Sequence, residues 1–129
     1  MARAKFTKGW ARPRSFDPHA VKMELTKGPV GASISASSPI FKFYAMGIID
    51  DFALSGHGHM TCNTGKINHA VTIVGWGHTE TYDKDYFIIK NSFGTDWGEE
   101  GFAKISVENN EKFKSGSCGI LSSVYALVE

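Results

Sequence analysis

Hydrophobic and polar residues follow two different periods in the first part of this chain. In residues 17–27 (DPHAVKMELTK), the apolar residues Val21 and Leu25 lie four positions apart, and Asp17 stands where a helix cap would be. Residues 30–36 (VGASISA) instead alternate small apolar and polar side chains. This alternation is typical of a half-buried strand. The pattern therefore predicts a short helix followed by a strand.

The second half of the chain is richer in strands. After a second helical turn that begins at Ser38-Pro39 and a turn-rich segment over 50–66, apolar runs follow at residues 67–76, 86–91, 101–107 and 123–129. The first two runs are too apolar for a sheet with one solvated face, so we expect both of their faces to be covered. We predict an α+β fold: a mostly antiparallel sheet, partly closed into a barrel, with one or two short helices at its edge.

Composition limits the classes of function. A chain of 129 residues with 42% hydrophobic residues is expected to form one domain, and its net charge of +1 gives no reason to expect a nucleic-acid partner. No apolar stretch approaches the roughly 20 residues that span a bilayer, and no secretory signal is recognised. Residues 1–16 contain five basic residues and no acidic one, which predicts a basic N-terminal arm, expected to be a solvated terminus, before a domain over 17–129.

The two cysteines, Cys62 and Cys118, leave two alternatives open. They could form one disulfide that closes a long loop, or remain as two buried thiols. Neither lies in a close Cys/His cluster, and His57 and His59 lack a third ligand, so no metal and no cofactor is expected. The neighbouring acidic pair at positions 50 and 51 is expected to consist of solvated turn charges.

One histidine has a possible chemical role. His69 stands at the head of the apolar run 67–76, where a histidine is more often structural than functional, and Asn91 stands at the end of the run 86–91. If these two strands are neighbours, the imidazole and the carboxamide can meet at one rim of the sheet. An asparagine oxygen that accepts from one ring nitrogen fixes the tautomer and leaves the other nitrogen free for a proton. This is the base-and-orienter part of a nucleophilic triad.

Three motifs carry a family resemblance: INHAVTIVGWG, then YFIIKNSFGTDWGEEGFAKI, then CGILSSVYALV. In this order they resemble the C-terminal half of papain-like cysteine proteases, the cathepsin family. The resemblance covers the chain from about Asp17 onward and implies a papain-like right-hand domain. It also implies that His69 is the catalytic base, that Asn91 orients it, and that Cys62 and Cys118 form a disulfide.

The same resemblance implies a set of substrate-binding residues. Trp97 matches the aromatic residue that flanks the primed side of the cleft. Ser33, Ala70 and Ser123 fall where the family lines its main specificity pocket. Small side chains at these positions would leave room for a bulky apolar side chain of a peptide or protein substrate.

The departures from the family pattern concern the nucleophile. The chain has no Q-x-x-x-C-W segment, so the nucleophilic Cys and the oxyanion Gln are missing, and Phe93 stands where the family usually carries tryptophan. We therefore predict half of a papain-like cysteine endopeptidase, completed by an N-terminal half-domain on another chain or on a missing segment. The alternative is an inactive module kept as a binding or structural subunit. The family setting predicts a lysosomal, vacuolar or secreted location.

Overall fold

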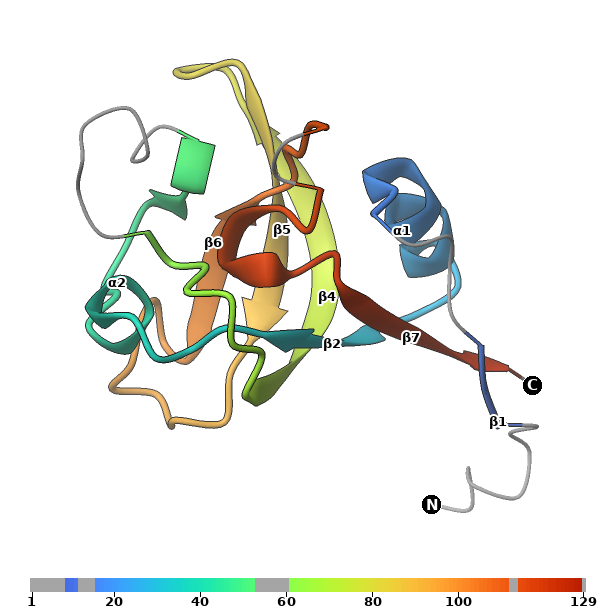
Figure 1. The fold of residues 1–129 in the computed structure, drawn as a ribbon, viewed down its shortest axis with the longest axis horizontal. Helices are drawn as coiled ribbons and strands as arrows, with labels where there is room; N and C mark the ends of the chain where they lie inside the picture. The colour runs from blue at the N-terminus through green and yellow to red at the C-terminus, as the bar shows by residue number, and fades with distance from the viewer. Residues whose placement is uncertain (1–8, 12–15, 53–60, 112–113, 129) are drawn as a thin grey trace.

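The computed structural model describes residues 9–11, 16–52, 61–111 and 114–128. Within them, ten elements follow one another along the chain: β1 (Gly9–Ala11), α1 (Pro18–Leu25), β2 (Val30–Ile34), α2 (Pro39–Lys42), β3 (Ile48–Ile49), β4 (His69–Thr79), β5 (Lys84–Lys90), β6 (Phe102–Ser106), the short 3-10 turn η2 (Ser117–Gly119) and β7 (Ser123–Val128) (Figure 1). The predicted α+β composition, with two short helices, is confirmed.

The strands form one sheet in the order β1-β7-β2-β4-β5-β6-β3. All pairs are antiparallel except β3 with β6, which is parallel. The predicted antiparallel character is therefore confirmed, but the predicted closure into a barrel is wrong. The edge strands β1 and β3, which have three and two residues, lie at opposite ends of this order and do not pair with each other. A closed barrel requires the two edge strands to pair with each other. Neither the number of strands nor the length of the turns specifies such pairing.

The core lies on one side of this open sheet. In β2, Val30, Ala32 and Ile34 are buried and the two residues between them are half-buried, as the alternating pattern predicts. The helix α1 begins after Asp17, whose side chain accepts hydrogen bonds from the backbone N–H groups of residues 19 and 20. Val21 of this helix is 1% exposed and belongs to the same core cluster. The helix therefore packs on the core side of the sheet.

The opposite side of the sheet is largely uncovered by the described residues. In β4, Ala70 and Thr72 are exposed, and so is Lys90, the cross-strand partner of Thr72 on β5. The prediction that these strands are covered on both faces is therefore wrong for the described residues. We call this side the outer face of the sheet.

A disulfide joins Cys62 to Cys118, so the alternative of two free thiols is wrong. The bond links residues 56 positions apart, and closing such a loop contributes about 4 kcal/mol in the chain-entropy model. Asp51 holds both ends of it. Its carboxylate accepts backbone hydrogen bonds from Cys62 (2.6 Å), Asn63 (2.9 Å) and Cys118 (3.0 Å).

The expectation of solvated acidic residues at positions 50 and 51 is therefore wrong. Asp50 is only 7% exposed and accepts a hydrogen bond from Lys84, which also binds Glu108. Sequence alone gave no sign of these partners, because they come from a cysteine loop and a strand far along the chain. Asp51 thus satisfies three backbone donors beside the disulfide, and Asp50 forms an ion pair with Lys84.

Part of the basic arm joins the sheet. Gly9–Ala11 pair with the last three residues of β7 as an edge strand. Residues 1–8 and 12–15, like His57 and His59, lie outside the described residues, so a separate arm over 1–16 remains a prediction. Among the helices described, none is long and apolar enough to cross a membrane.

We expect Asp51→Asn to lower the free energy of unfolding by about 1–3 kcal/mol, because the amide group replaces one acceptor oxygen with a donor that faces backbone N–H groups. Chemical denaturation with the disulfide intact would measure this. The control is Asp96→Asn, which changes an exposed carboxylate of the loop after β5. Equal stability of the two variants would contradict the role of Asp51.

Candidate active site

The structure brings His69 and Asn91 together. His69 is the first residue of β4, and Asn91 follows the last residue of β5 directly. Because these strands are antiparallel neighbours, the start of one lies beside the end of the other. The His69 Nε2 atom is 2.7 Å from Asn91 Oδ1. The expected contact between the imidazole and the carboxamide is therefore present.

A second hydrogen bond fixes the tautomer of the ring. The backbone N–H of Ser92, which can only donate, lies 2.8 Å from the same Oδ1 atom of Asn91. This contact identifies the atom as the carbonyl oxygen of the amide, and a carbonyl oxygen can only accept. His69 must therefore carry its proton on Nε2. In the neutral ring, Nδ1 keeps its lone pair, and no described residue donates a hydrogen bond to it.

Aromatic rings surround this pair. The Phe93 ring lies 4.9 Å from the His69 ring, and the Phe41 ring lies 6.0 Å away in an edge-on arrangement. Phe41 is fully buried, whereas Phe93 is 47% exposed. Phe93 thus covers the imidazole from the solvent side without sealing it, and it has no N–H group with which to donate.

Trp97, predicted to flank the cleft, lies behind this aromatic cover. It is 7% exposed, its ring packs 4.9 Å from Phe41, and its Nε1–H group donates to the Phe41 carbonyl at 2.9 Å. This hydrogen bond ties the loop after β5 to α2, which fixes both aromatic neighbours of His69. Its role in binding substrate remains a prediction.

Asn91 itself is 5% exposed, and its Nδ2 atom is a buried donor for which no described residue supplies an acceptor. A buried donor without a partner costs roughly 1–3 kcal/mol. Such a cost is found at sites where the position of a side chain matters more than the stability it contributes.

Residues that the sequence did not single out hold His69 from the other side. The preceding residue, Asn68, donates from Nδ2 to the Ser37 hydroxyl at 2.6 Å and accepts at Oδ1 from the backbone N–H of Ala36 at 3.0 Å. Its own backbone N–H donates to the carbonyl of Ile34. The start of β4 is thus anchored to the segment after β2. The only sequence signal was an asparagine directly before the histidine.

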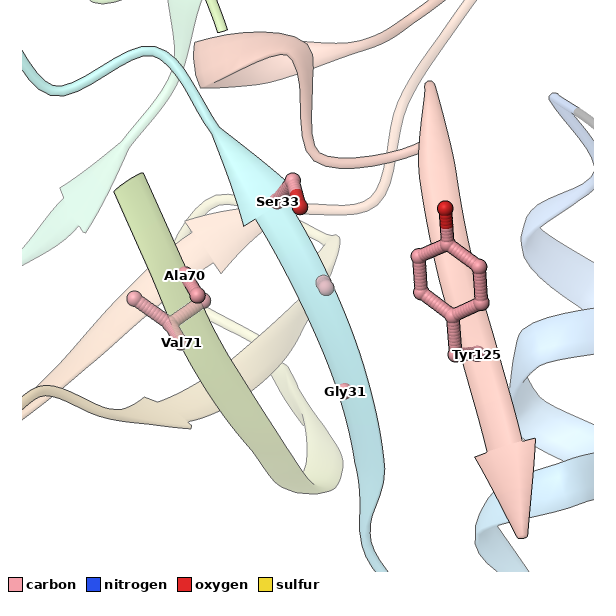
Figure 2. A pocket seen from close by; sticks show the side chains of 6 residues that line it. Gly31, Ser33, Ala70, Val71 and Tyr125 are labelled. Carbon is pink, nitrogen blue, oxygen red and sulfur yellow. The ribbon is translucent and has the colours of Figure 1, made fainter. Parts of the chain in front are cut away.

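The three predicted pocket residues lie in one row across three strands. Ser33 of β2 pairs with Ala70 of β4 on one side and with Ser123 of β7 on the other. An open groove of about 320 Å³ lies here on the outer face, and Figure 2 shows its lining from β2, β4 and β7: Gly31, Ala32, Ser33, Ala70, Val71 and Tyr125. Ser33 and Ala70 thus line the groove, whereas Ser123 lies beside it without being part of the lining.

The chain has no thiol that could act as a nucleophile. Both of its cysteines belong to the disulfide and are fully buried. Across the described residues, no group of three His, Cys, Asp or Glu side chains could hold a metal ion. The site therefore contains an imidazole whose Nε2–H group is held by the Asn91 carboxamide, and it contains no free thiol.

Comparisons with known proteins identify the family to which the chain is similar. The sequence matches a protein family described as "Papain family cysteine protease" over residues 3–128. It is 41% identical over 97 residues to procathepsin L of Felis catus and 34% identical over 117 residues to cathepsin L1 of Drosophila melanogaster. These matches cover 74% and 90% of this chain but only 25% and 28% of the two relatives.

The chain is also similar in structure to a solved cysteine protease. The bromelain protease of Ananas comosus, in complex with the E64 inhibitor, superposes with a TM-score of 0.77 and 28% identity. That match covers 95% of this chain and 50% of the bromelain chain. The chain thus spans about a quarter of the length of its curated relatives and half of this solved structure.

We expect Asn91→Ala to leave the His69 ring as a mixture of its two neutral tautomers, because the only described acceptor for Nε2–H is lost. NMR of the ring nitrogens would measure the change from the single Nε2–H form of the wild type. Ser92→Ala is the matched control, since it keeps the backbone N–H that binds Asn91. A single Nε2–H tautomer in Asn91→Ala would show that Asn91 does not orient the ring.

Proposed function

Because the chain belongs to the papain family of cysteine proteases, we propose that it works as one half of a papain-like endopeptidase. In this proposal His69 is the catalytic base and Asn91 orients it. A cysteine and a glutamine on another chain, or on a segment beyond this sequence, complete the site. The observation that carries the proposal is the hydrogen bond from His69 Nε2 to Asn91 Oδ1, which leaves Nδ1 as the proton-accepting atom.

The geometry supports a definite proton path. The thiol of the partner's cysteine would give its proton to His69 Nδ1, and the thiolate would attack the carbonyl carbon of the peptide bond. As the C–N bond breaks, the imidazolium returns the proton to the leaving amine. Water then hydrolyses the acyl-enzyme, with His69 again acting as the base. Throughout, Asn91 accepts from Nε2–H and keeps the ring from turning.

The outer face offers a surface for the complementary half. Exposed or half-buried residues form a row across it from β7 to β6: Tyr125, Gly31, Thr72, Lys90 and Phe102. Lys90 lies 5.0 Å from the ring of Phe102, and no carboxylate of the described residues pairs with it. A partner with a small apolar surface and an acidic residue opposite Lys90 would suit this row.

The groove supports a preference for a bulky apolar substrate side chain, because most of its lining residues are small and none of them carries a charge. The disulfide supports a lysosomal, vacuolar or secreted location, where such bonds persist. The alternative function, an inactive module kept as a binding or structural subunit, is favoured by one observation: the chain has no free thiol.

The test is labelling with a thiol-directed epoxide probe, applied to a tagged copy of this chain expressed in its source cells. We expect a cysteine on a co-purifying chain to be labelled, and the intact mass of each chain would show it. His69→Ala should abolish this labelling, whereas His19→Ala, which changes an exposed histidine of α1, should not. A stable complex without any labelled cysteine would overturn the proposal in favour of a binding subunit.

In the assembled peptidase, we expect Ser33→Phe to lower kcat/KM by about 10-fold or more for peptides whose bulky apolar side chain binds in the groove. The reason is that the new ring fills the groove. Cleavage of peptides with a small residue at that position should fall less. The ratio of kcat/KM for the two peptide types measures this. Lys27→Phe, which adds the same ring to an exposed position, is the control. An unchanged ratio would place substrate recognition outside the groove.

A further inference from the structure

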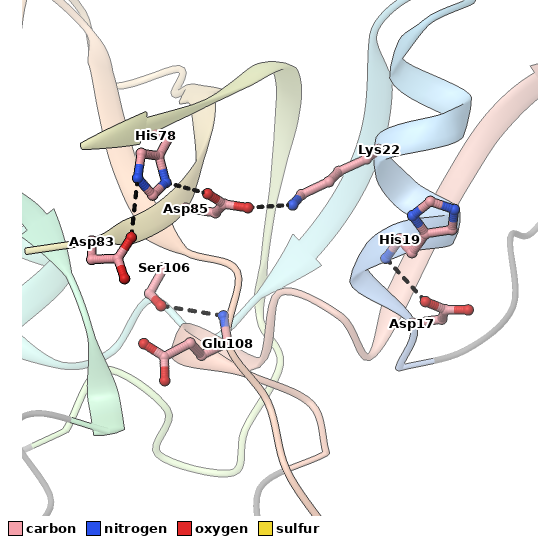
Figure 3. Close-up of polar contacts among 8 residues, drawn as sticks. All are labelled: Asp17, His19, Lys22, His78, Asp83, Asp85, Ser106 and Glu108. Atoms are coloured by element: carbon pink, nitrogen blue, oxygen red, sulfur yellow. Dashed lines mark hydrogen bonds and ion pairs between the residues drawn. The ribbon is translucent and has the colours of Figure 1, made fainter. Parts of the chain in front are cut away.

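A second histidine of β4 lies in a cluster of charged side chains, far along the strand from His69. The β4–β5 register shifts at a bulge between Ile73 and Gly75, and beyond it His78 is the cross-strand partner of Asp85. The His78 Nδ1 atom is 2.6 Å from Asp85 Oδ1, and its Nε2 atom is 3.3 Å from Asp83 Oδ1 (Figure 3). Each ring nitrogen thus faces one carboxylate.

The helix α1 reaches the same cluster. Lys22 of this helix places Nζ 2.6 Å from the other carboxylate oxygen of Asp85. The same Nζ lies 4.2 Å from the centre of the Trp76 ring on β4. Asp85 therefore links the helix to the hairpin, as the dashed contacts in Figure 3 show. The side chain of Lys22 is 19% exposed and that of Asp85 is 31% exposed, so solvent only partly screens their attraction.

We propose that His78, Asp83 and Asp85 form an acid-operated clasp within the β4–β5 hairpin, and that Lys22 joins this clasp to α1 through Asp85. Neutral imidazole has one N–H group and can donate to only one of the two carboxylates. The protonated ring donates from both nitrogens, so it binds Asp83 of the hairpin turn and Asp85 of β5 together and holds both against β4. This inference is independent of the proposed peptidase function.

The surrounding charges favour the protonated ring. The hydrogen bond that His78 donates to Asp85 raises the pKa of His78 above its ordinary value of 6.5, and the charges of Asp85, Asp83 and Glu80 act in the same direction. Lys22 is the only cation placed against Asp85 from the helix. The other lysine of this region, Lys84, is engaged by Asp50 and Glu108.

The titration of His78 sets the upper pH limit of the clasp, and the titration of Asp85 sets its lower limit. Because the pKa of folded His78 is raised, its stabilising contribution is complete below 6.5 and is lost as the pH rises through the raised value. The hydrogen bond from Lys22, followed by that from His78, lowers the pKa of Asp85 from 3.8. The contribution of Asp85 is therefore present above 3.8 and is lost as the pH falls through its lowered value. The clasp is complete in the mildly acidic range between these limits.

Hydrogen exchange of the hairpin, read by mass spectrometry at about pH 5.5 and about pH 8 with correction for intrinsic rates, tests this proposal. We expect the amides of residues 76–87 to be about two- to five-fold better protected at the acidic pH. His78→Gln should remove this difference. His19→Gln, which changes an exposed histidine of α1, should leave it unchanged.

Two results would overturn the clasp. One is equal protection of the hairpin at both pH values in the wild type. The other is a pH difference that persists in His78→Gln. If His78→Gln does not fold, Asp83→Asn replaces it, because the Asp83 side chain is 95% exposed and lies in the hairpin turn. That variant should reduce the pH difference, and an undiminished difference would likewise reject the proposal.

Discussion

The position of β2 between β4 and β7 is the constraint on which the rest of this structure depends. All five residues of β2 pair with β4, and four of them also pair with β7. In a strand, a shift of one residue moves every side chain to the opposite face. The fully buried Ile34 and Ile73 of the core would then move outward, so burial holds the register in place. The same register sets Ser33 beside Ala70 and Ile34 beside His69. The same strand register therefore determines both the packing of the core and the placement of the candidate site.

His69 is held by contacts that differ in kind. On one side Asn91 accepts a hydrogen bond from its Nε2–H group, and the amide of Asn91 is itself oriented by the backbone of Ser92. On the other side Asn68 anchors the start of the strand through Ser37. These are short, directional hydrogen bonds, whereas the nearby aromatic rings exclude water without setting an angle. Because these hydrogen bonds fix the ring in the chain as it stands, the imidazole is preorganised for the proposed role of catalytic base.

The sequence predicted the part of this site that depends on local order. A histidine that opens one strand and an asparagine that follows its antiparallel neighbour must meet if the hairpin forms, and it does. It did not predict features that depend on distant partners. Asp51 was expected in solvent because its donors, including Cys118, lie up to 67 residues away. Barrel closure was wrong for a similar reason, since only the three-dimensional twist decides whether the two edge strands meet.

The proposed complementary half-domain would account for two independent features of this chain. The site has an oriented imidazole but no free thiol, so the proposed peptidase site lacks its nucleophile. The outer face carries Ala70, Thr72 and Lys90 in the open, which is a gap in packing for strands whose sequence reads as covered on both sides. Half of the bromelain structure has no counterpart in this chain. A second half-domain that covers the outer face and brings a cysteine to the rim at His69 would close both gaps at once. An inactive subunit would need only a partner that covers the outer face. It would not need an oriented His69 ring, so the fixed orientation of this ring is the observation that favours the peptidase over the inactive subunit.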